Sequence, residues 1–197
     1  MPTELSYRIL LVVVLVAFIG HRGYYTRKYG RPDSETIQSR QGGAAQVVAN
    51  VLSLVALLAS AVYVLAPGLL SGAGLPLTAW LRWGGIALAA AGFALLQWAH
   101  TALSRNWSDA PRLMKGQTLT TRGPYRWVRH PMYSAFLLIL SAPLLLSANW
   151  LVGLPWIAAT ALDIAGRIGF EEGILADAFG TEFFDYTQTT GRLLPRF

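Results

Sequence analysis

Long apolar runs separated by shorter polar stretches dominate this amino-acid sequence. The runs cover approximately residues 5–21, 47–65, 77–99, 132–147 and 150–167. A helix needs about 20 apolar residues to cross the hydrocarbon core of a bilayer, and the first three runs meet that length. We therefore predict an all-α integral membrane protein with five transmembrane helices.

The fourth and fifth runs have roughly 16–18 residues each, which is near the lower limit for a span. Only a short stretch around Ser147-Ala148-Asn149 separates them. Two helices joined by so short a connection form an antiparallel pair, which predicts a tight helical hairpin. A re-entrant hairpin is the competing interpretation.

The chain turns polar after about Arg167. We expect a further helix around Glu171–Phe179, ended by Gly180, because glycine is common just past a helix C-terminus. The whole chain, 1–197, is thus predicted to be one membrane domain with three spans in residues 1–100. His21-Arg22 follows the first run where a signal peptide would have small residues, so we favour a retained span over a cleaved signal peptide.

Composition supports this class of protein. The chain is 54% hydrophobic and only 13% charged, which is typical of a multi-spanning membrane protein. It has no cysteine, which excludes disulfides, thiolate nucleophiles and zinc–sulfur sites. Its net charge of +6 indicates basic loops facing anionic lipid headgroups rather than a nucleic-acid partner.

The basic residues also predict an orientation. With the N-terminus outside, 14 of the 16 Lys and Arg residues fall in segments 22–46, 101–129 and 167–197, all on the inner side. Only Arg8 and Arg82 fall elsewhere. Cytoplasmic loops of membrane proteins are enriched in Lys and Arg. We therefore expect the C-terminal helical tail to lie in the cytoplasm.

Charged residues at the end of the fifth run are the first candidates for chemistry. Asp163, Arg167 and Glu171 are spaced four residues apart and share one helical face. They form either an ion-pair ladder that closes the helix end or a polar wall that faces a cavity. Glu172 points about 100° away from Glu171, and the ladder explains it least.

A second cluster of candidate residues precedes the fourth run, in Gly123-Pro124-Tyr125-Arg126-Trp127-Val128-Arg129-His130-Pro131-Met132-Tyr133. Pro131 biases His130 towards an extended backbone and suits the first position of a helix. A helix N-terminus favours anions, so a carboxylate could dock beside His130. His100, at the end of the third run, is expected to lie at the interface in a structural hydrogen bond.

These motifs together resemble one known family. Arg129-His130-Pro131-Met132-Tyr133, with Gly123-Pro124-Tyr125 before it and Glu171-Glu172 after it, is similar to the isoprenylcysteine carboxyl methyltransferase family and its phospholipid methyltransferase relatives. The closing Gly191-Arg192-Leu193-Leu194-Pro195 agrees. The resemblance extends from about Ser104 to the end of the chain. The small size resembles five-span prokaryotic members, which implies a prokaryotic inner membrane.

The resemblance implies S-adenosylmethionine as methyl donor, bound by region 101–197, and a lipophilic acceptor that enters from the bilayer. Arg167 would orient the acceptor, with Glu171 as its catalytic partner. Asp163 has no counterpart in the family pattern; it could either hold Arg167 in place or neutralise its charge, which leaves the charge of the acceptor open. The implied cofactor-binding residues are Tyr125, Arg129, His130, Pro131, Tyr133, Glu171 and Glu172.

The residues leave the acceptor open. A carboxylate needs no base, whereas a phospholipid amine or a thiol must lose a proton, for which Glu171 or Glu172 would serve. An NADPH-dependent membrane reductase and a non-enzymatic membrane scaffold are the alternatives from other classes. We expect membrane lipids as neighbours and neither nucleic acid nor metal as a partner; the oligomeric state stays open.

Overall fold

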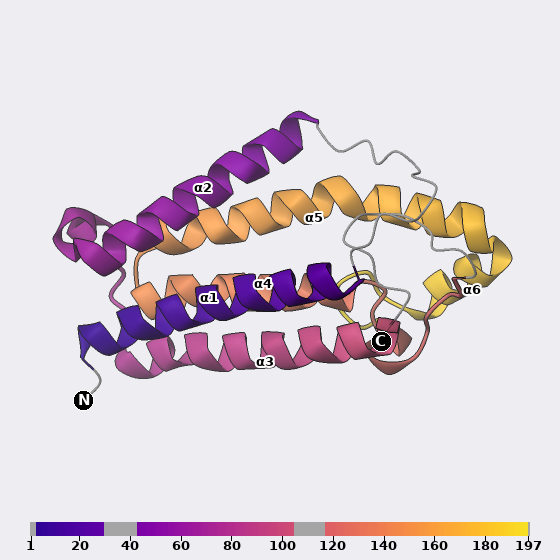
Figure 1. The fold of residues 1–197 in the computed structure, drawn as a ribbon, viewed down its shortest axis with the longest axis horizontal. Helices are drawn as coiled ribbons and strands as arrows, with labels where there is room; N and C mark the ends of the chain where they lie inside the picture. Colours follow the sequence, from indigo (N-terminus) through magenta and orange to yellow (C-terminus); the bar gives the residue numbers. More distant parts are fainter. Residues whose placement is uncertain (1–2, 30–42, 105–116, 197) are drawn as a thin grey trace.

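The computed structural model describes residues 3–29, 43–104 and 117–196. Within these ranges every regular element is helical, apart from two isolated bridge pairs. Figure 1 shows long helices lying side by side. The elements are α1 (Glu4–Tyr29), α2 (Ala44–Leu65), the 3-10 helix η1 (Pro67–Ala73), α3 (Ala79–Leu103), the 3-10 helix η3 (Gly123–Arg126), α4 (Pro131–Ser147), α5 (Trp150–Phe179) and α6 (Thr181–Thr189).

Several of these helices have the length and composition of membrane spans. Among the described residues, α1, α2, α3 and α5 are long and apolar enough to cross a bilayer. The predicted all-α, multi-pass membrane architecture is confirmed to that extent. Helix α4 is apolar but has only 17 residues. It runs between the same two ends of the bundle as its neighbours (Figure 1), and its role as a fifth span stays a prediction.

Helix α4 is the centre of the bundle. Ala135, Ile139 and Leu146 on its first face are fully buried against α1 and α3. Leu140, on another face, packs in a cluster built from α1, α2 and α5. Glycine allows the close approach of α3: a Cβ at Gly92 would lie 2.6 Å from a side-chain carbon of Ile139. Because α4 packs against helices on several sides, its first residues are held in place relative to α3 and α5.

The hairpin predicted from the fourth and fifth runs is present. Ala148 takes a left-handed conformation (φ 47°, ψ 41°), and Asn149 caps α5 by accepting a hydrogen bond from the Leu151 N–H. A Cβ at Gly153 would lie 2.3 Å from the Leu144 Cα, so only glycine fits where α5 leaves α4. These contacts fix how α5 returns along α4.

Two predicted boundaries were wrong. Helix α1 continues to Tyr29, so Arg27 and Lys28 lie in its last turn and not in a loop, where their charges favour the helix C-terminus. The helix expected around Glu171–Phe179 is not separate, because α5 runs unbroken from Trp150 to Phe179. Gly180 does end it, in a positive-φ conformation (φ 51°).

His100 also differs in part from its prediction. Its imidazole Nδ1 makes the expected structural hydrogen bond, at 2.8 Å from the Leu96 carbonyl oxygen. The side chain is, however, 1% exposed, because it packs against the rings of His21 and Tyr25 on α1. The sequence pattern could not show this contact between helices.

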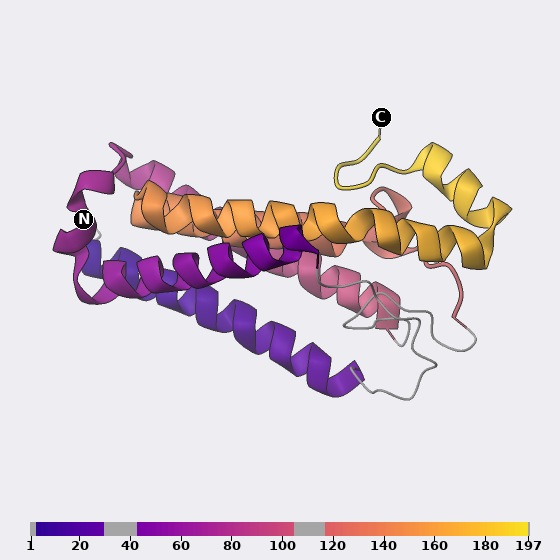
Figure 2. The same cartoon turned by 90° about the horizontal axis from the view of Figure 1, so that it is seen from above.

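Arg82 joins four helices at the end of the bundle that holds the N-terminus. Its guanidinium donates to both carboxylate oxygens of Glu4, at 2.8 and 3.1 Å, and to the Tyr63 hydroxyl at 3.0 Å. It also donates twice to the Leu146 carbonyl in the last turn of α4. Figure 2, which shows the molecule from above, has this end on the left and the C-terminal helix α6, in yellow, at the other end of the bundle. Arg82 is therefore a structural clamp.

Candidate functional site

The predicted site residues come together at the other end of the bundle. Figure 1 shows the start of α4, the last part of α5 and helix α6 meeting there. The C-terminal segment runs back beside the chain that precedes α4. The N–H groups of Arg129 and His130 donate to the carbonyls of Gly191 and Arg192, at 2.8 and 3.0 Å. The tail is thus hydrogen-bonded to the segment that carries the Arg-His-Pro motif.

Gly191 is required by this arrangement. A Cβ on it would lie 1.8 Å from the Leu194 carbonyl oxygen, because the chain folds back on itself there. Its N–H donates to the Trp127 carbonyl at 3.2 Å. Ser134, in the first turn of α4, donates its hydroxyl to the Leu193 carbonyl. The tail is therefore fixed against both sides of the motif.

Glu172 joins three elements of the site. One carboxylate oxygen accepts from Arg129 Nε at 2.9 Å and lies 3.4 Å from His130 Nε2. The other accepts from Arg192 Nε and Nη2, at 2.9 and 2.6 Å. The Glu172 and Arg129 side chains are only 11% and 10% exposed. Glu172 therefore ties α5 to the motif and to the tail at once.

Glu171 has a different set of neighbours. Tyr133, in the first turn of α4, donates its hydroxyl to Glu171. His130 Nδ1 lies 3.6 Å from the second carboxylate oxygen, and the rings of His130 and Tyr133 are stacked at 5.5 Å. The Glu171 side chain is 23% exposed against 7% for His130. The side chains of four predicted site residues are thus in contact with one another: His130, Tyr133, Glu171 and Glu172.

Arg167 lies one turn before Glu171 but does not pair with it. Its Nε donates to Asp163 Oδ1 at 2.9 Å, and both side chains are partly exposed. The three-residue ladder predicted from the spacing is therefore only half formed, because Tyr133 and His130 already engage Glu171. Within the residues that the structure describes, the two Nη groups of Arg167 form no hydrogen bond.

Two of the predicted cofactor-binding residues, Tyr125 and Pro131, are buried in the protein. Pro131 is fully buried at the first position of α4, as its sequence context predicts. Tyr125 is 7% exposed and packs against Ala99 and Ala102. Burial raises the pKa of its phenol well above the usual value. Its carbonyl accepts a hydrogen bond from Tyr186, whose pKa is raised to about 12, chiefly by burial, so the hydroxyl stays a donor at neutral pH.

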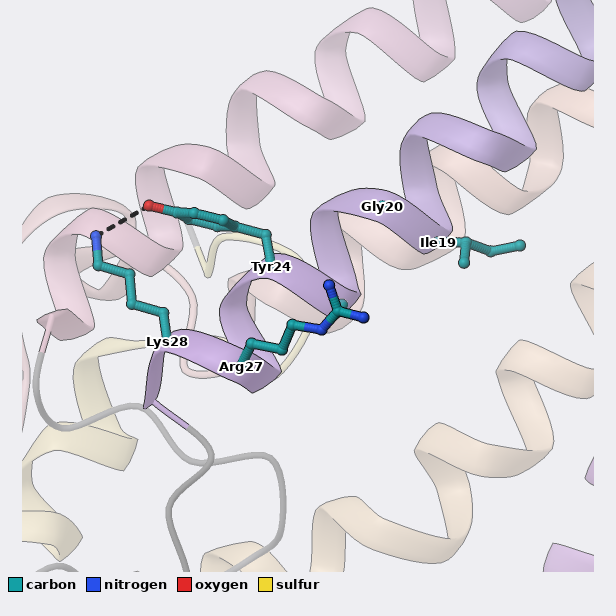
Figure 3. Close-up of a pocket in the computed structure, with 6 residues that line it drawn as sticks. Ile19, Gly20, Tyr24, Arg27 and Lys28 are labelled. Atoms are coloured by element: carbon teal, nitrogen blue, oxygen red, sulfur yellow. Dashed lines mark hydrogen bonds between the residues drawn. The ribbon is translucent and has the colours of Figure 1, made fainter.

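A separate groove of about 530 Å³ lies on the outer face of α1. Figure 3 shows its labelled residues along that helix, with a hydrogen bond of 3.2 Å from Lys28 Nζ to the Tyr24 hydroxyl. No predicted site residue lines it. The lining residues, all exposed, are Ile19, Gly20, Gly23, Tyr24, Arg27 and Lys28.

Sequence reasoning named Arg192 only as part of a closing motif and missed its ion pair with Glu172. It also missed that Arg129 donates to the carbonyls of Thr187 and Thr190 at the end of α6. The Gly191-Arg192 pair was the available signal in the sequence. The glycine permits a tight turn, and the arginine that follows it needs an acidic partner. The carbonyl acceptors leave no mark in a sequence.

Part of the chain is similar to a known protein family. The sequence model of the isoprenylcysteine carboxyl methyltransferase family matches residues 85–177, from the middle of α3 almost to the end of α5. These residues make up just under half of the chain, and over them the sequence is similar to that family. The matched residues include the Arg-His-Pro motif and both glutamates, but end before the tail that holds Arg192.

A likeness in fold extends beyond the matched region. A solved structure of the eukaryotic intramembrane Ras methyltransferase ICMT, without a monobody, superposes with a TM-score of 0.69 over 98% of this chain and 68% of that chain. The two sequences are 18% identical, so this likeness concerns the fold. No sequence among the curated proteins matches this chain.

Proposed function

We propose that the protein transfers a methyl group from S-adenosylmethionine to the carboxylate of a lipid-borne acceptor of the isoprenylcysteine type. The observation that carries this proposal is the meeting of His130, Tyr133 and Glu171, with Arg167 one turn away on α5. These residues lie in the region that matches the family. They offer a carboxylate, on Glu171, for the methyl donor and a guanidinium, on Arg167, for the acceptor.

The donor set fits the methyl donor. S-adenosylmethionine carries an ammonium, a carboxylate and ribose hydroxyls, and it supplies an electrophilic methyl group when bound. Glu171, 23% exposed, can accept from the ammonium or the hydroxyls. The start of α4 at Pro131 favours a carboxylate, because a helix N-terminus carries partial positive charge. Arg129 and Glu172 would close the site by holding the tail against α5.

Arg167 would bind the acceptor. A planar guanidinium can hold a carboxylate through two parallel hydrogen bonds, which fixes its direction as well as its position. A carboxylate is already a nucleophile at neutral pH, so no general base has to act on it. The chain then has to align the two substrates and exclude water. This role leaves Glu171 free to serve the donor.

The surroundings of Arg167 favour an acceptor with a lipid tail. Arg167 lies on an apolar helix with exposed apolar side chains near it, among them Leu162 and Phe170, each 36% exposed. Burial of each methylene group of a tail contributes about 0.8 kcal/mol. The distribution of basic residues supports a cytoplasmic position for this end of the bundle, with α4 as the fifth span. A reporter fused after Phe197 tests that orientation and contradicts it if the reporter is active only outside.

Thermal unfolding in detergent tests the cofactor. S-adenosylhomocysteine at about 100 times its dissociation constant should stabilise the protein by about 2.7 kcal/mol and raise its melting temperature. NADPH at the same concentration should leave the melting temperature unchanged. Stabilisation by NADPH alone would favour a membrane reductase, and the absence of any response would favour a non-enzymatic scaffold; both would contradict the proposal.

A further inference from the structure

Asp163 is an ionisable residue that no motif explains. It lies on α5 within a helix that has the composition of a membrane span, where a carboxylate is costly and normally has a partner. Its partner is Arg167, with 2.9 Å between Asp163 Oδ1 and Arg167 Nε. If this end of α5 faces the cytoplasm, as proposed above, a pair that is a quarter to a third exposed contributes little to the free energy of unfolding. Stability alone therefore does not account for it.

Arg167 has a carboxylate one turn away on either side. Asp163 precedes it by four residues and Glu171 follows it by four, and both spacings suit an ion pair on a helix. The structure forms only the pair with Asp163, because Glu171 is held by Tyr133 and faces His130. The guanidinium is thereby directed towards the N-terminal side of α5 and away from the glutamate.

The atom that Asp163 occupies matters. It binds Nε, at the side of the guanidinium, and leaves the two Nη groups at its end. These are the groups that form an end-on fork with a carboxylate. If Asp163 bound an Nη group instead, that group would no longer be available to the acceptor carboxylate.

We propose that Asp163 is a positioning residue for the methyl acceptor: it holds Arg167 through Nε, so that the Nη fork faces the acceptor carboxylate and stays away from Glu171. The inference rests on the proposed function, because it assumes that Arg167 binds the acceptor. Asp163 touches neither substrate. It separates the acceptor group on Arg167 from the donor group on Glu171, although the two residues lie on the same helical face.

The test is a double-mutant cycle with a prenylated thioether carboxylic acid as acceptor. Asp163→Ala should lower kcat/KM for the acceptor about tenfold, a size typical of coupled neighbouring groups. The dissociation constant of S-adenosylhomocysteine should change less than about threefold, since Glu171 keeps its own partners. Asp163→Asn retains an oxygen that accepts from Nε and should recover most of the activity. Asp177→Ala, an exposed carboxylate on the same helix, is the matched control and should behave as wild type.

The Arg167→Ala background decides the interpretation. There, the additional Asp163→Ala change should alter kcat/KM less than about twofold, because the group it positions is gone. An equal loss in both backgrounds, or wild-type activity of Asp163→Ala, would overturn the inference while the proposed function stands. If the wild-type protein binds S-adenosylhomocysteine but forms no methyl ester on the acid, the proposed acceptor is wrong and the inference falls with it.

Discussion

Replacing Arg167 by alanine is expected to lower kcat for a lipid carboxylate about 100-fold, which corresponds to roughly 2.7 kcal/mol of lost transition-state stabilisation. The acceptor loses the group that directs its oxygen, and misorientation lowers the rate of an in-line transfer. The dissociation constant of S-adenosylhomocysteine should change less than about threefold, because the ion pair of Arg167 is with Asp163, whereas Glu171 is held by Tyr133 and His130. Steady-state kinetics and a binding titration measure the two effects separately.

Two further variants sharpen that prediction. Arg167→Lys should recover only part of the rate, since an ammonium keeps the charge but has no planar fork. Arg126→Ala removes an exposed arginine that stacks 4.2 Å from the Trp127 ring, and it should retain wild-type kinetics. Full rescue by lysine would mean that charge alone matters. An equal loss of cofactor affinity in Arg167→Ala would move Arg167 into the donor site.

Replacing Glu172 by glutamine is expected to weaken S-adenosylhomocysteine binding at least about 100-fold. The change leaves the buried Arg129 guanidinium without its counter-ion, and removing one partner of such a pair costs about 3 kcal/mol or more. It also releases Arg192, so the tail loses its charged link to α5. The site should open while the bundle, whose core surrounds α4, stays folded. Isothermal titration in detergent measures the affinity.

The partners of Glu172 provide graded controls for this variant. Arg192→Gln removes only the partner that is 56% exposed and should weaken binding less than Glu172→Gln does. Asp185→Asn changes an exposed carboxylate on α6 and should have no effect. Circular dichroism and gel filtration show whether each variant is folded. A folded Glu172→Gln protein with wild-type affinity would remove Glu172 from the account of the site.

Much of the architecture follows from local sequence. The apolar runs predict α1, α2, α3 and the α4–α5 pair, since the length of an apolar run and the shortness of the 148–149 connection are local properties. Pro131 and Gly180 were placed correctly at a helix start and a helix end for the same reason. The meeting of the Arg-His-Pro motif with Glu171-Glu172 came from the resemblance and could not have come from periodicity.

Choices between partners were not predictable. Arg167 had two carboxylates at equal spacing, and only the position of Tyr133 on a neighbouring helix decides between them. From the sequence, Arg82 was only a basic residue outside the segments expected to be cytoplasmic, whereas in the structure it bonds Glu4 and the Leu146 carbonyl across the bundle. The end of α1 was placed too early because a polar sequence suggests a loop even where a helix continues beyond the apolar core.

The most direct test of the central claim is the fate of a labelled methyl group. Purified protein is incubated with methyl-labelled S-adenosylmethionine and prenylated thioether carboxylic acids of decreasing chain length. We predict label in the lipid product that mild alkali releases as methanol, as a methyl ester requires, and a steep fall in incorporation as the chain shortens. Alkali-stable label on a phospholipid amine or a thiol, or no transfer to the acid at all, would contradict the account.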